Sequence, residues 1–153
     1  MTSAGALSVS GPSRSPTCTP SVLGLAAVEE GVALLAEAGM RALRAKSVAQ
    51  TEFAVALHRA WLEPLGFELA TPPEPARRGS HVSLRHPQAW PIKQALAERA
   101  GVIVDYRPPD AIRLGIAPAY TRFVDVWDAF DRLRRLVVAG EHHAFSSVPD
   151  RVT

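Results

Sequence analysis

The stretch that decides the fold reads GVIVDYRPPDAIRLGIAP and runs from Gly101 to Pro118. Apolar residues alternate with polar or small ones on both sides of its centre, which is typical of strands with one buried face. Arg107 to Asp110 contains two prolines and predicts a tight turn. Because a tight turn joins antiparallel strands, the stretch predicts an antiparallel pair formed by Val102 to Tyr106 and Ala111 to Ile116.

Strand and helix patterns continue upstream and downstream of this pair. Further strands are predicted at Phe67 to Thr71 and His81 to His86, joined by a proline-rich loop, Pro72 to Gly79, that we expect to be exposed. Helical spacing predicts four helices: Thr19 to Gly39, Met40 to Glu63, Pro87 to Ala100 and Thr121 to Gly140. The predicted fold class is α+β, a small antiparallel sheet with helices packed on one face, preceded by two long helices.

The sequence also predicts where the folded domain begins and ends. Residues 1–18 are rich in Ser, Thr, Pro and Gly and carry one charge, so they bury too little to offset the entropy of ordering. We therefore expect a disordered tail at 1–18, one folded domain at 19–141 and a flexible tail at 142–153. The two long helices carry more apolar surface than a small sheet needs, so part of it is expected to meet another chain.

Composition excludes several classes of protein. The 153 residues carry a net charge of +2, which is too balanced for a nucleic-acid binder. No stretch has the roughly 18 apolar residues of a membrane span, so no membrane partner is expected. The chain has one cysteine, Cys18, which excludes an internal disulfide and indicates a reducing, cytoplasmic compartment. Cys18 lies in the predicted tail and has no neighbouring base, so no catalytic role is assigned to it.

Arg113 is the candidate binding residue. In the strand Ala111 to Ile116 it faces away from Ile112 and Leu114, on a side whose other residues are small. A guanidinium there either forms a surface salt bridge or clamps a carboxylate with two parallel hydrogen bonds. Spacing alone favours the salt bridge.

Histidines supply the other candidate sites. His81 alternates with Ser83 and Arg85 on one strand face, either as a polar site wall or, the reading we favour, as a solvated outer face. His142 and His143 are adjacent in a short tail that supplies no further ligands, so no metal site is predicted.

Four segments together resemble the C-terminal region of kynureninases, a family of pyridoxal-phosphate enzymes with the class V aminotransferase-like fold. They are TPSVLGLAAVEEGVALL (19–35), AGMRALRAKSVAQT (38–51), RGSHVSLRHPQAW (78–90) and GVIVDYRPPDAIRLGIAPAYTRFVDVWDAF (101–130). The resemblance implies an enzyme that hydrolyses L-kynurenine to anthranilate and L-alanine. It also implies pyridoxal 5'-phosphate as cofactor, a homodimer, and an amino-acid substrate.

The resemblance assigns two site residues. In the family motif I/L-R-F/V-G/A, which reads Ile112-Arg113-Leu114-Gly115 here, the arginine binds the substrate α-carboxylate, so Arg113 is the implied substrate-binding residue. The family's G-T-P turn contacts the cofactor phosphate of the neighbouring subunit and reads Cys18-Thr19-Pro20 here, which makes Thr19 the implied cofactor-binding residue. The cysteine replaces a glycine, so the turn is expected to differ.

The segments that resemble kynureninases do not include the family's large domain, which carries the Schiff-base lysine. The chain has two lysines, Lys46 and Lys93, and neither lies in a cofactor-lysine motif. No catalytic residue is therefore assigned, and the isolated chain is expected to be inactive unless a separate large-domain chain completes it. The alternative hypothesis is a non-catalytic binding or dimerisation module that retains the fold.

Overall fold

The computed structural model describes residues 22 to 148. The chain divides into two compact units, residues 1–34 and 35–153, and the sheet and core belong to the second. The tail predicted at 1–18 and the domain start predicted at Thr19 lie outside the described residues.

The first helix, α1 (Val22–Ala38), has no buried residue. Its apolar side chains are solvent-exposed; Val22 and Val28, for example, expose 76% and 61% of their surface. Gly39 follows at φ 77°, a conformation that glycine adopts without steric cost, and α2 begins at the next residue. The break predicted at Gly39 is confirmed.

The second helix, α2 (Met40–Leu57), continues as a π-helical turn at His58–Leu62 and a 3-10 turn at Glu63–Leu65. Gly66, at φ 87°, ends the helical run where the sequence predicted. α2 buries polar as well as apolar side chains, and these hold distant segments. Gln50 Nε2 donates to the carbonyl of Thr121 at 2.7 Å, and Ser47 Oγ lies 2.7 Å from Ser80 Oγ.

Four strands form one sheet in the order β1 (Glu68–Leu69), β2 (His81–Arg85), β4 (Ala111–Gly115), β3 (Asp105–Arg107), and every neighbouring pair is antiparallel. The predicted antiparallel pair and the α+β class are confirmed. β3 is shorter than predicted because it pairs with β4 only opposite Ala111 to Arg113. The preceding apolar residues have no partner strand, and Ile103 is 89% exposed.

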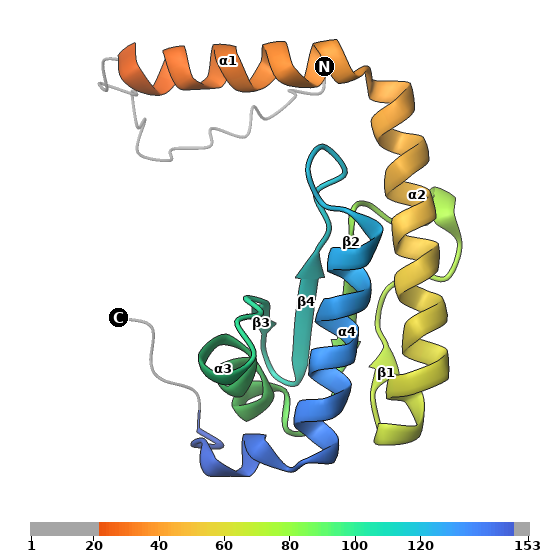
Figure 1. The fold of residues 1–153 in the computed structure, drawn as a ribbon, viewed down its shortest axis with the longest axis vertical. Helices are drawn as coiled ribbons and strands as arrows, with labels where there is room; N and C mark the ends of the chain where they lie inside the picture. Colours follow the sequence, from red (N-terminus) through yellow and green to blue (C-terminus); the bar gives the residue numbers. More distant parts are fainter. Residues whose placement is uncertain (1–21, 149–153) are drawn as a thin grey trace, which may run out of the picture. The chain divides into compact units, whose positions relative to one another are not determined.

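The core lies on one face of this sheet. Val82 and Leu84 of β2 and Ile112 and Leu114 of β4 point into it and are at most 6% exposed. Helices α2, α3 (Ala89–Arg99) and α4 (Phe123–Val138) supply most of the other core side chains. Figure 1 shows α2 and α4 side by side. Helices therefore cover one face of the sheet, as the sequence predicted.

Residues in the first turns of α3 and α4 explain where these helices begin. Pro91 lies in the first turn of α3, where the missing N–H costs little. α4 starts with a capping box in which the Arg122 backbone N–H donates to Asp125 Oδ2 at 2.7 Å. Asp125 also accepts from the Arg122 side chain, and this hydrogen bond lowers the pKa of Asp125 to about 2.

Two segments are more firmly packed than the sequence predicted. In the loop expected to be exposed, Arg78 is buried; it donates to Thr51 Oγ1 at 3.0 Å and pairs with Glu52. In the segment expected to be a flexible tail, a 3-10 helix, Glu141–Ala144, buries His142, and Phe145 packs against the core. Both differences arise because side chains meet partners far away in the sequence, which local composition cannot reveal.

Candidate functional site

The face of the sheet opposite the core is polar, and we call it the open face. It consists of the residues that alternate with the core residues along the four strands. Its members are Glu68 of β1, His81, Ser83 and Arg85 of β2, Ala111, Arg113 and Gly115 of β4, and Asp105 and Arg107 of β3.

Arg113 stands at the centre of the open face because β4 lies between β2 and β3. Its direct cross-strand neighbours are Ser83 on one side and Asp105 on the other. The Arg113 side chain is 36% exposed, and its Nη2 donates to Asp105 Oδ2 at 2.6 Å. The salt bridge that spacing favoured is therefore present, and the guanidinium is still open to solvent.

Only one nitrogen of Arg113 is engaged. Within residues 22–148, Nε and Nη1 have no hydrogen-bond or ion-pair partner. A guanidinium has five N–H donors, so it can hold Asp105 and still offer donors to a second carboxylate. The arrangement is therefore compatible with both readings of Arg113, a salt bridge and an anion clamp.

The site contains two residues that the sequence analysis did not single out. Asp105 Oδ2 also forms an ion pair with Arg107 Nη2 at 2.7 Å, so one oxygen pairs with two arginines. The length of the turn between the two strands could have predicted that Asp105 and Arg107 belong to the site. If Pro108 to Asp110 form the loop, Arg107 faces Ala111 and Asp105 then faces Arg113, which is the observed register.

Of the remaining open-face residues, some are solvated and Ala111 is buried. His81 and Arg85 are exposed, and Arg85 lies 3.9 Å from Asp110, beyond hydrogen-bond distance. The favoured reading of His81, Ser83 and Arg85 as an outer face agrees with this exposure. Three arginines face three carboxylates here, namely Asp105, Asp110 and Glu68, the cross-strand neighbour of Arg85, so the formal charges balance.

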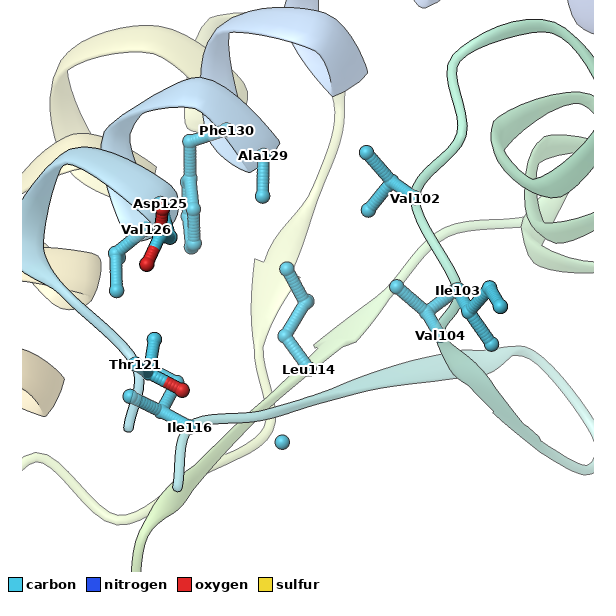
Figure 2. Close-up of a pocket in the computed structure, with 11 residues that line it drawn as sticks. Val102, Ile103, Val104, Leu114, Ile116, Thr121, Asp125, Val126, Ala129 and Phe130 are labelled. Carbon is cyan, nitrogen blue, oxygen red and sulfur yellow. The ribbon is translucent and has the colours of Figure 1, made fainter. Parts of the chain in front are cut away.

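A separate small cavity of about 80 Å³ lies on the core side of the sheet. Figure 2 shows Val102 to Val104, Leu114 and Ile116 facing Val126, Ala129 and Phe130 of α4 across it. The lining is mainly apolar, and its one carboxylate, Asp125, is held by Arg122. Arg113 does not line this cavity, so the apolar cavity and the candidate anion site are different places.

The described residues do not form a pyridoxal phosphate site. Such a site needs a free amine beside the cofactor. Lys46 lies on α2 and Lys93 on α3, two helices that pack on the core side of the sheet, and the Lys93 amine lies over the Trp90 ring at 5.3 Å. Neither amine is on the open face. Thr19 and Cys18 lie outside the described residues.

The buried histidines have structural partners. His58 Nε2 lies 2.9 Å from the carbonyl of Phe67, and His142 Nε2 lies 3.0 Å from Gln88 Oε1. Burial lowers the pKa of His142, and the neighbouring His143 and His86 lower it further. In the part of the chain that the structure describes, no three His, Cys, Asp or Glu side chains are grouped to hold a metal ion. No helix within that part has the length and apolar character to cross a membrane.

The family model for the kynureninase C-terminal domain matches residues 43–133, which include β2, β3, β4 and most of α4. The chain belongs to the kynureninase family. Kynureninases from Burkholderia mallei strain SAVP1, Burkholderia pseudomallei strain 1106a and Pseudomonas fluorescens are each 42% identical to it over 119 residues. The match covers 78% of this chain and 28% of each relative, so the chain corresponds to the C-terminal part of a kynureninase.

Proposed function

We propose that Arg113 binds the α-carboxylate of an amino-acid substrate in a kynureninase-type site. The observation that carries the proposal is a partly exposed arginine on the central strand, where Asp105 takes one N–H of Nη2 and the other donors have no partner among residues 22–148. Two parallel N–H···O bonds, one from the second N–H of Nη2 and one from the adjacent Nε or Nη1, are a strong and directional way to hold a carboxylate.

By resemblance, the ligand is L-kynurenine and the complete reaction is its hydrolysis to anthranilate and L-alanine. Pyridoxal 5'-phosphate would supply the electron sink for that reaction when bound. The described residues of this chain would bind and orient the substrate carboxylate, and they offer no lysine for the cofactor. We therefore propose that these 153 residues alone are inactive and that a large domain carrying such a lysine completes the site in the cytosol.

Binding tests the role of Arg113. Purified protein is titrated with L-kynurenine by NMR, alongside Arg113→Ala and the matched control Arg85→Ala. Arg85 lies on the same face, and Asp110, its ion-pair partner within residues 22–148, is 3.9 Å away. We expect Arg113→Ala to weaken binding about tenfold or more, because charge-assisted hydrogen bonds are lost, and Arg85→Ala to change it little. Equal binding by Arg113→Ala and the wild type would rule out the clamp.

Activity tests the second part of the proposal. Pyridoxal phosphate and L-kynurenine are added to the purified chain, and anthranilate is followed by its fluorescence. We expect no turnover above the protein-free control. Turnover that Arg113→Ala abolishes would show that the chain needs no partner.

A second candidate function, an interaction module, rests on α1. None of its residues is buried, and Val22, Leu25, Val28 and Val32 each expose more than half of their surface. An apolar helix of this kind gains free energy when a partner covers it. The partner would be either the large-domain chain or a second copy, as in a homodimer. Analytical ultracentrifugation separates these cases, and a stable monomer with no bound partner would remove the hypothesis.

A further inference from the structure

We propose that Asp105 is a positioning residue that holds the Arg113 guanidinium ready for the substrate carboxylate. The inference rests on the proposed function of Arg113 and adds a second residue to that site. Asp105 is the direct cross-strand neighbour of Arg113, and its Oδ2 accepts from Arg113 Nη2 at 2.6 Å.

Asp105 is itself held from two sides. The same oxygen forms an ion pair with Arg107 Nη2 at 2.7 Å, and Arg107 lies two residues along β3 on the same face. A carboxylate fixed by two guanidinium groups is a stiffer anchor than one held by a single flexible arginine. Arg113 therefore meets a partner whose position is already set by the strand and by Arg107.

The contact leaves the binding donors free. Asp105 uses one N–H of Arg113 Nη2 and leaves the second, together with Nε and Nη1, without a partner among residues 22–148. Arginine has high rotamer entropy, and a ligand that binds a disordered arginine must order it. Asp105 removes part of that cost before the ligand arrives, which is the physical basis of the proposed role.

Asp105 also weakens ligand binding, because its negative charge repels a carboxylate. Two substitutions separate this repulsion from the positioning of Arg113. Asp105→Asn removes the charge and keeps an oxygen acceptor for Arg113, while Asp105→Ala removes both. Repulsion is absent in both variants, so the difference between them measures positioning.

The experiment uses the full chain labelled with ¹⁵N and two readouts. The first is the affinity for L-kynurenine. The second is the heteronuclear NOE of the Arg113 Nε–Hε group, assigned by its loss in Arg113→Ala. Asp110→Asn is the matched control, because Asp110 lies in the turn between β3 and β4 and pairs with Arg85, not with Arg113. Asp105 is exposed, so its variants are expected to fold, and thermal unfolding checks this.

We expect Asp105→Ala to bind L-kynurenine about three- to fivefold more weakly than Asp105→Asn, a modest effect because the pair is partly exposed. The NOE of Arg113 should fall in Asp105→Ala and stay near the wild-type value in Asp105→Asn and Asp110→Asn. Equal affinity and equal NOE in the two Asp105 variants would overturn the proposal, as would tighter binding by Asp105→Ala.

The two proposals fail in distinguishable ways. If the wild type does not bind L-kynurenine, the function proposed for Arg113 is lost, and the NOE alone then decides whether Asp105 orders Arg113. If binding depends on Arg113 but not on the difference between Asp105→Ala and Asp105→Asn, the carboxylate clamp stands and the positioning role is lost.

Discussion

The two faces of the sheet use the same strands for different purposes. Ile112 and Arg113 are adjacent in β4, yet Ile112 is fully buried and the Arg113 side chain is 36% exposed. The core face is closed by α2, α3 and α4, while the open face carries charged side chains that pair with one another. The contrast shows that alternate residues of one strand can be divided between a buried apolar core and an exposed charged face.

The largest expected effect is on the core face. Ile112→Ala should lower the free energy of unfolding by about 2–5 kcal/mol, because it removes buried methyl groups and leaves a cavity. Chemical denaturation followed by circular dichroism measures the change. A loss below about 1 kcal/mol would mean that the core closes around the smaller side chain and that the two faces differ less than their burial indicates.

A smaller effect is expected from pH on the core side. Burial lowers the pKa of His142 below its ordinary value of 6.5, and His143 and His86 contribute in the same direction. Below pH 6.5 the folded state therefore binds fewer protons than the unfolded state. The contribution of His142 to the free energy of unfolding is fully present above pH 6.5 and is lost as the pH falls from 6.5 through the folded pKa.

Thermal unfolding at several pH values measures this dependence, and His142→Gln should make it shallower. Some slope should remain, because burial also lowers the pKa of His86. His81→Gln is the matched control, since it removes an exposed histidine of the open face. If His81→Gln reduced the pH dependence of stability more than His142→Gln does, His142 would not be the source of that dependence.

The smallest effect is expected on the open face. Arg113→Ala should change the free energy of unfolding by no more than about 0.5–1 kcal/mol, because it breaks a partly exposed ion pair. The same denaturation assay compares it directly with its neighbour Ile112→Ala. A loss comparable to that of Ile112→Ala would show that the open face also carries the fold.

Local sequence predicted much of this architecture. Alternation in Ala111 to Ile116 placed Ile112 and Arg113 on opposite faces, and Gly39 and Gly66 marked the breaks around α2. It predicted β3 less well, because the apolar run Val102 to Val104 has strand character but no partner strand. A strand depends on a neighbour that local periodicity does not reveal.

The sequence by itself determined the kynureninase resemblance, the α+β class and the outward direction of Arg113, because motifs and strand periodicity are local properties. Only the tertiary structure decided that Asp105 pairs with Arg113 and Arg107, and that Arg78 and His142 are buried. These contacts join residues from different segments, so they depend on strand register and helix packing.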